Sequence, residues 1–288
     1  MAGRKKRVRA KAASPATRAG VTAAAGRAGD PSLTHDDIMN AATRVDPELR
    51  RRSELLWEDR SPSTRGPRAS FTPEEVVRAA IALADAEGLA AVTMQAVSAT
   101  LGYTTMAIYR YFPNKESLYD AIVDAGLGLP PAPAEPAENW RECVARWAHA
   151  KRDMLCARPW LAELPFVAAP HGPNWLAWLE ALAEPLSRTG LSAADLGQMI
   201  SVVDGYTRGA SDTSISLVRW RARRISAQAW AAAVGADLGR AIGDERFPVF
   251  ASILTAAPDG RPRSMAESFD FGLQLVLDGV QQYVERRI

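Results

Sequence analysis

Residues 71–126 carry the feature that most constrains the fold, a run of short helices with sharply marked ends. The stretch Thr72-Pro73-Glu74-Glu75 is a strong helix start, because threonine can cap, proline suits the first helical position and Glu75 completes a capping box. Apolar residues then recur at helical spacing until Gly88. Further helices are predicted over about 93–100 and 104–112, and a fourth begins at its cap, Asn114.

The second and third of these helices are joined by the tight turn Leu101-Gly102-Tyr103, which makes the pair a helix-turn-helix. The predicted seam between them consists of Ala96, Val97, Leu101, Ile108 and Phe112. The outward face of the third helix carries Thr104, Thr105, Met106, Tyr109, Arg110 and Tyr111. Hydroxyl groups can donate to phosphates, and threonine and methionine methyl groups can pack on thymine methyls. The third helix is therefore predicted to enter the major groove of DNA with its N-terminus leading.

Two stretches of this segment resemble the tetracycline-repressor (TetR) family of bacterial regulators. They are GLAAVTM at residues 88–94 and LGYTTMAIYRYFPNKESL at residues 101–118. Tyr103 stands where the family usually has valine, and Tyr111 stands where it usually has histidine. The resemblance implies a sequence-specific DNA-binding transcriptional regulator, expected to be a repressor that a small-molecule effector releases from a palindromic operator. Activation instead of repression remains an alternative, because the sign depends on where the operator lies.

The resemblance also implies DNA contacts by position. Gln95 falls where family members often touch a base or phosphate, Thr105 and Met106 where base edges are read, and Lys115 on a lysine that clamps the backbone. Tyr109 and Tyr111 fall on phosphate-contacting positions, with burial in the core as the alternative for Tyr109. The candidate DNA-binding residues are Thr93, Gln95, Tyr103, Thr104, Thr105, Met106, Tyr109, Arg110, Tyr111, Lys115, Arg65 and Arg68.

Charge is divided unevenly along the chain, although the net charge is only +2. Residues 1–68 hold 15 Lys and Arg against 8 Asp and Glu, whereas the remaining residues hold 20 against 25. Residues 69–128 alone hold three basic residues against seven acidic ones. Because affinity for DNA depends largely on neutralised phosphates, we hypothesise that the basic arm supplies the missing charge, with Arg65, Arg68 and arginines 50–52 near the duplex. A solvated tail is the alternative.

Composition and helix-breaking residues divide the chain into three parts. Residues 1–68 are predicted to be a basic, largely disordered arm with weak helical character over 33–60. Residues 69–128 form the helix-turn-helix domain, and the Pro-rich stretch 127–137 marks a boundary. Residues 138–288 are predicted to be helical near 138–157, 160–167, 173–189, 192–222, 226–243, 246–256 and 264–286. No segment shows convincing strand alternation, so the fold class is all-α, a three-helix DNA-binding domain followed by a helical domain.

The C-terminal part more loosely resembles the effector-binding and dimerisation domain of the tetracycline-repressor class. It contains seven of the eight tryptophans, and aromatic-lined cavities between helices are common ligand sites. The candidate ligand-binding residues are Trp147, Met154, Trp160, Phe166, Trp175, Trp178, Met199, Val203 and Tyr206, with plain core packing as the alternative for each. A homodimer is expected through the helix 192–222 and the final helix, whose apolar stripe consists of Phe269, Leu273, Val276, Val280 and Tyr283. Gly272 and Gly279 would allow close helix approach there.

Other classes of protein find little support in the sequence. No Ser/His/acid arrangement, Gly-rich phosphate loop or metal cluster is visible, so we expect neither an enzyme nor a cofactor. His149 with Asp153 is read as a solvated or core pair and Asp204 with Arg208 as a structural ion pair. The longest apolar runs fall short of the roughly 20 residues that span a bilayer, and only two cysteines occur, so we expect a cytoplasmic protein without membrane contact. A non-specific architectural DNA-binding protein remains the main rival.

Overall fold

The computed structural model describes residues 46–58, 71–132, 138–163, 170–222, 224–256 and 264–287. The chain divides into two units, Met1–Pro47 and Glu48–Ile288, and of the first only Asp46 and Pro47 are described. Within the described ranges the regular secondary structure is helical, which confirms the all-α prediction. None of the described helices is both long and apolar enough to cross a bilayer.

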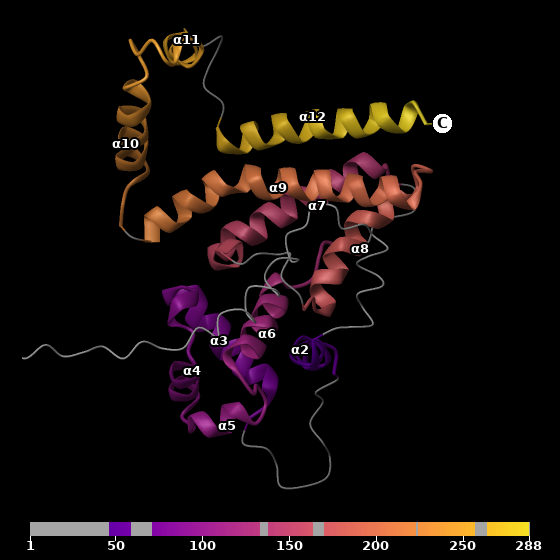
Figure 1. Ribbon diagram of the computed structural model, residues 1–288, viewed down its shortest axis with the longest axis vertical. Helices are drawn as coiled ribbons and strands as arrows, with labels where there is room; N and C mark the ends of the chain where they lie inside the picture. The colour runs from indigo at the N-terminus through magenta and orange to yellow at the C-terminus, as the bar shows by residue number, and fades with distance from the viewer. Residues whose placement is uncertain are drawn as a thin grey trace, which may run out of the picture. The chain divides into compact units, whose positions relative to one another are not determined.

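The helix-turn-helix domain forms as the sequence predicts. Its elements are α3 (Pro73–Glu87), the 3-10 turn η3 (Leu89–Ala91), α4 (Met94–Leu101), α5 (Thr105–Tyr109) and α6 (Lys115–Leu127) (Figure 1). The Thr72 capping box and the Asn114 cap are both present. Gly102 has φ 75°, a left-handed conformation that ends α4 and lets α5 cross it.

One helix is described before this domain, within residues 46–58, and it lies inside the segment predicted as an arm. It is α2 (Pro47–Trp57), and α2 from Glu48 onward belongs to the same compact unit as the rest of the described chain. The sequence predicts weak helical character over 33–60, and α2 is the helix described within that region. The sequence did not predict that α2 would pack on other helices.

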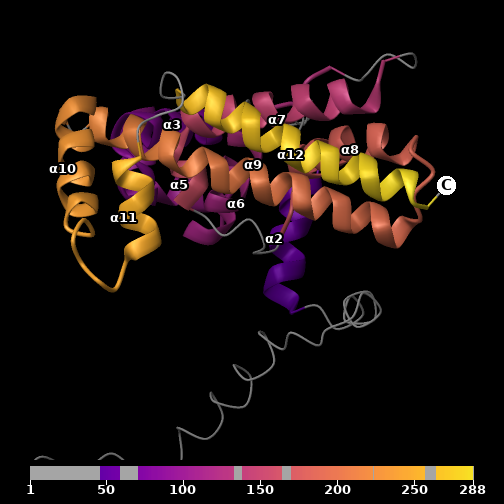
Figure 2. The ribbon, with the colours of Figure 1, turned by 90° about the horizontal axis from the view of Figure 1, so that it is seen from above.

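The C-terminal part is a layered set of helices. Its elements are α7 (Trp140–Ala157), η4 (Pro159–Glu163), α8 (Pro173–Ser187), α9 (Ala193–Ala222), α10 (Ala227–Gly239), α11 (Pro248–Thr255) and α12 (Met265–Glu285). The helix α9 contacts both α7 and α12; it lies between them in Figure 1, and α12 lies over it in the view from above in Figure 2. Large apolar side chains of α7, α8, α9 and α12 are buried in one continuous core.

The structure corrects the interpretation of α12. The predicted dimer stripe packs against α9 of the same chain, with Phe269, Leu273 and Val280 buried. A Cβ atom added to Gly272 would lie 2.5 Å from the Tyr206 hydroxyl oxygen, so Gly272 allows the close approach of α12 to α9 within one chain. Helical periodicity identifies the buried face of a helix and leaves open which surface covers it.

His149 and Asp204, one member of each predicted polar pair, have partners on other helices. Lys151 Nζ of α7 lies 3.6 Å from Asp204 Oδ1 of α9. His149 Nε2 lies 3.4 Å from Asp270 Oδ1 of α12, so it pairs across helices instead of with Asp153. Both partners are distant in sequence, which is why spacing along one helix did not identify them.

Candidate nucleic-acid interface and effector domain

The predicted DNA-reading face of α4 and α5 is an exposed surface. Met106 is 76% exposed and Tyr109 41% exposed, whereas Ile108 between them is fully buried. Ile108 is therefore core, as predicted. The other exposed candidates are Thr93, Gln95, Tyr103, Thr104, Arg110 and Lys115. A short helix with one face buried and the opposite face exposed is the arrangement that insertion into a major groove requires.

Two of the candidates use their hydroxyl groups within the protein. The Thr105 hydroxyl lies 3.2 Å from that of Ser98, across the helix-turn-helix seam. The Tyr111 hydroxyl donates to the Phe71 carbonyl oxygen at 3.1 Å, and its ring packs edge-on against Phe71. Tyr103 also packs on Phe71, with ring centroids 4.7 Å apart. The rings of Tyr103 and Tyr111 thus hold Phe71, two residues before α3, beside the recognition helix α5.

The start of α6 presents a cation beside the same surface. Lys115 is exposed, and its ammonium group lies 4.7 Å from the centre of the Tyr119 ring. The Tyr119 hydroxyl lies within hydrogen-bond distance of the carbonyl oxygens of Leu89 and Val92. The ring is therefore fixed, and it limits the positions that the Lys115 side chain can take.

Candidates Arg65, Arg68 and Phe166 lie outside the described residues. The sequence predicts Arg52 near the duplex, but in the structure its guanidinium binds the Asp120 carboxylate of α6. Arg50 and Arg51 are exposed. Helical geometry turns successive residues to different sides of α2, so the three arginines cannot share one contact surface.

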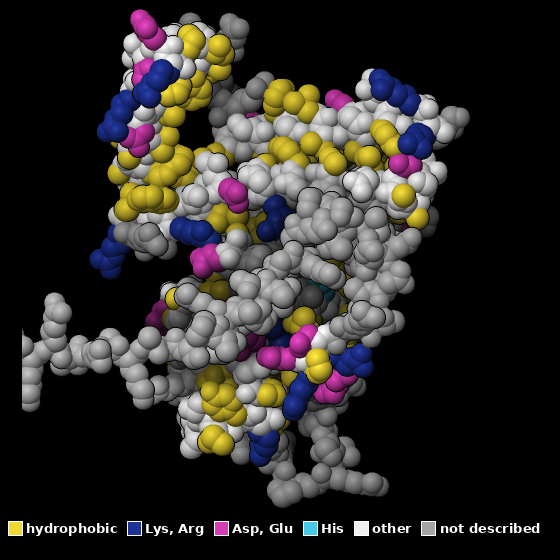
Figure 3. Space-filling view, viewed as in Figure 1, with side chains coloured by type: hydrophobic (Ala, Val, Ile, Leu, Met, Phe, Trp, Pro, Cys, Tyr) yellow, Lys and Arg dark blue, Asp and Glu magenta, His cyan; other side chains and the backbone are white. Residues whose placement is uncertain are grey.

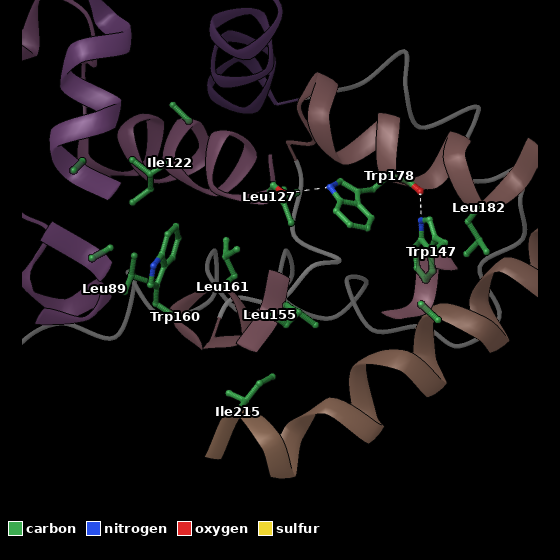
Figure 4. Close-up of a cluster of buried hydrophobic side chains, with 14 of the residues drawn as sticks. Leu89, Ile122, Leu127, Trp147, Leu155, Trp160, Leu161, Trp178, Leu182 and Ile215 are labelled. Atoms are coloured by element: carbon green, nitrogen blue, oxygen red, sulfur yellow. Dashed lines mark hydrogen bonds between the residues drawn. The ribbon is translucent and has the colours of Figure 1, made fainter. Parts of the chain in front are cut away.

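The C-terminal part, residues 138–288, is called the effector domain after its expected role. It is joined to α6 through two tryptophans predicted to line a pocket. The Trp147 indole N–H donates to the Trp178 carbonyl oxygen at 2.8 Å. The Trp178 indole N–H lies 3.3 Å from the Leu127 carbonyl oxygen and 3.1 Å from that of Gly128, at the end of α6. Figure 4 shows this chain of contacts among the buried side chains.

A buried carboxylate makes a second junction. Asp124 of α6 accepts from the backbone N–H groups of Asn174 and Trp175, at 3.3 and 2.9 Å, in the first turn of α8. Burial raises the pKa of Asp124, and these two backbone hydrogen bonds partly offset the rise. Gly172 is required here, since a Cβ atom would lie 2.3 Å from the Asp124 carboxyl carbon. No sequence motif indicated this contact.

Trp160 forms a third junction, with α3. Its indole N–H donates to Asp85 Oδ1 at 2.7 Å, and Arg158 donates to the Gly126 carbonyl oxygen at 2.9 Å. Trp160 and Trp178 are both buried and hold α3 and α6 against the effector domain. The sequence identified these tryptophans and did not identify their partners.

One cavity of the effector domain has the character of a ligand site. It measures about 440 Å³ and lies between α7, α8 and the segment that follows α6. Its lining consists of Leu129, Pro130, Pro131, Ala132, Cys143, Arg146, Trp147, Ala177, Glu180, Ala181 and Glu184. Trp147 is a candidate that lines this cavity. Burial raises the pKa of the Cys143 thiol.

The remaining ligand-binding candidates belong to the hydrophobic core of the same domain or pack against it. Val203 is buried, and Met154, Trp175, Met199 and Tyr206 pack against the core. Tyr206 donates to the Phe269 carbonyl oxygen at 2.6 Å.

Burial lowers the pKa of Lys151, whose ammonium group lies within 5.3 Å of the Trp147 and Trp178 ring centres. Among the residues that the structure describes, no group of three or more His, Cys, Asp or Glu could hold a metal ion.

Comparison with known proteins supports both domains. A family model for bacterial regulatory proteins of the tetR family matches residues 76–122, and one for the tetracyclin repressor-like C-terminal domain matches residues 132–284. The HTH-type transcriptional repressor DrrR1 of Streptomyces coeruleorubidus is 32% identical over 245 residues, which cover 83% of this chain and 88% of DrrR1.

Solved structures share the fold. ActR of Streptomyces coelicolor in complex with actinorhodin matches with a TM-score of 0.62 and 21% identity, over 76% of this chain and 99% of ActR. BioQ of Mycobacterium smegmatis matches with a TM-score of 0.52 and 26% identity, over 73% of this chain and 97% of BioQ. The exposed recognition surface, the all-helical second domain and these matches together show that the chain belongs to the TetR family of DNA-binding transcriptional regulators.

Proposed function

We propose that the protein represses transcription as a cytoplasmic homodimer and has no enzymatic activity. The observation that carries the DNA-binding role is the exposed face of α5 around Met106 and Tyr109, set against a buried Ile108. Met106 and Thr104 would contact base edges, whereas Tyr109, Arg110 and Lys115 would contact phosphates. Base contacts determine sequence preference, and phosphate contacts determine affinity and its salt dependence.

Substitutions on this face test the assignment. Met106→Ala should weaken binding to the specific operator by about fivefold or more and leave binding to random DNA unchanged, because a base contact is worth about 1–3 kcal/mol. Lys115→Ala should weaken binding to both DNAs and reduce the salt slope by about one. Equal losses on both DNAs for Met106→Ala would contradict its role in reading bases.

The dimer surface is proposed to lie on the outward faces of α9 and α12. Phe271 and Leu275 of α12 are 49% and 57% exposed, and Val202 of α9 is 49% exposed. Figure 3 shows hydrophobic side chains along α12 and over α10 and α11. A two-fold dimer would place two recognition helices about one DNA turn apart and would bind a palindrome. Phe271→Asp with Leu275→Asp should yield monomers in analytical ultracentrifugation, whereas an unchanged dimer mass would place the interface elsewhere.

The cavity beside Trp147 is proposed to hold the effector. Its apolar walls favour an apolar, aromatic ligand, and the relative ActR was crystallised with actinorhodin. A thermal-shift screen of aromatic compounds, begun with actinorhodin, tests the site. A compound that binds there should raise the melting temperature of the wild type and not that of an Ala177→Trp variant, whose larger side chain fills the cavity. Hits that stabilise both proteins equally would contradict the assignment.

A further inference from the structure

The helix α2 is held against α6 by contacts from its first turn and its middle. Arg52 Nε and Nη2 donate to the two carboxylate oxygens of Asp120 at 2.6 and 2.7 Å. The side chains are only 19% and 13% exposed. Asn114, the cap of α6, donates to Glu48 at 3.2 Å. A bidentate, partly buried arginine–carboxylate pair is among the stronger polar contacts in proteins and fixes the relative orientation of its two helices.

The other end of α2 reaches the effector domain. The Trp57 indole N–H donates to the His171 carbonyl oxygen at 3.2 Å. The His171 ring stacks on Trp175 of α8, with centroids 3.8 Å apart. Between these ends, Leu55 and Leu56 face α3 across a cavity of about 640 Å³ that Arg158 also lines. The helix therefore contacts α6 and its cap through Arg52 and Glu48, and the segment before α8 through Trp57.

This arrangement separates Arg52 from its two neighbours in the arginine triplet. The Arg52 guanidinium is directed at Asp120, so its charge is already balanced within the protein. Arg50 and Arg51 are exposed on other sides of the same helix. A guanidinium that is already paired with a carboxylate contributes little net charge to phosphate binding. An exposed guanidinium can neutralise a phosphate without breaking a contact within the protein.

We propose that Arg52 is a positioning residue for operator binding, which acts through α2 and never touches DNA. By fastening α2 to α6 while Trp57 contacts the segment before α8, Arg52 holds the DNA-binding domain at a set orientation against the effector domain. Two recognition helices can reach successive grooves only when both domains are correctly oriented. Fixing that orientation before binding removes an ordering cost from the association.

The test compares Arg52→Ala and Asp120→Asn with the matched control Arg51→Ala, all in the full-length protein. Hydrogen exchange of residues 48–57 reports whether α2 is docked. Affinity is measured over a salt series for a DNA duplex selected from a random pool by the wild-type protein. Arg52→Ala and Asp120→Asn should speed exchange in α2 and weaken binding at least fivefold, with an unchanged salt slope. Arg51→Ala should leave exchange in α2 unchanged.

The exchanged pair Arg52→Asp with Asp120→Arg distinguishes positioning from a general loss of stability. It should restore protection of α2 and bring the affinity to within twofold of the wild type. The proposal is overturned if Arg52→Ala lowers the salt slope without changing exchange, because Arg52 would then contact phosphate. It is equally overturned if α2 amides exchange freely in the wild type. Should Arg52→Ala not fold, Asp120→Asn, which keeps the shape of the side chain, carries the same test.

Discussion

Replacing Trp178 with phenylalanine should weaken the junction between the effector domain and α6. The ring of Trp178 is buried, with 3% exposure, and its N–H faces the carbonyl oxygens of Leu127 and Gly128 at 3.3 and 3.1 Å. Phenylalanine keeps the aromatic contact and removes the donor. A buried acceptor left without a partner costs about 1–3 kcal/mol, and the space vacated by the larger indole adds roughly 1 kcal/mol. The free energy of unfolding should therefore fall by about 2–4 kcal/mol.

Urea unfolding followed by circular dichroism measures this loss, at one fixed protomer concentration because the protein is expected to be a dimer. The matched control is Trp175→Phe. Trp175 is only partly buried, stacks on His171 and would keep its backbone hydrogen bond to Asp124. The control should cost less than about 1 kcal/mol, the usual range away from buried polar contacts. A Trp178→Phe midpoint equal to that of the wild type, or an equally large loss in the control, would refute the reasoning.

Three further predictions follow from the same contacts and from the charge of the arm. Gly126→Ala should lower stability by about 1–3 kcal/mol in urea unfolding, because its Cβ would lie 2.6 Å from Trp160 Cη2, and wild-type stability would contradict the close approach. Burial raises the pKa of the Asp124 carboxyl above the 3.8 of an exposed one, so the stability that this shift contributes is present below about pH 4 and is lost as pH rises through the raised pKa. Asp124→Asn should remove that part of the pH dependence of the free energy of unfolding. Parallel pH profiles for the variant and the wild type would contradict the prediction. Deleting residues 1–46, which leaves the whole of α2 (Pro47–Trp57) in place, should weaken DNA binding and flatten its salt dependence, whereas an unchanged salt slope would mean that the arm before α2 makes no phosphate contacts.

The helix-turn-helix domain could be predicted closely because its signals are local. Thr72, Gly102 and Asn114 each act on residues within four positions of themselves, through caps and a left-handed turn. The exposure of Met106 and the burial of Ile108 follow from helical periodicity in the same way. Such features need no knowledge of the rest of the fold.

The contacts between domains could not be predicted, since each joins residues far apart in the sequence. Asp124 caps a helix that begins about fifty residues later, and Arg52 meets Asp120 across 68 positions. The α12 stripe was assigned to the wrong neighbour for a related reason. Periodicity showed that Phe269 and Leu273 are buried, while only the structure showed that α9 covers them.

The most direct test of the whole account is binding of the purified protein to DNA from upstream of its own gene, against an excess of random DNA, over a salt series. We predict tight binding that survives the competitor, with a protected palindrome in a footprint, and loss of that specificity in Met106→Ala. Weak binding that random DNA abolishes, with a salt slope set by the basic arm alone, would contradict the account and favour a non-specific architectural protein.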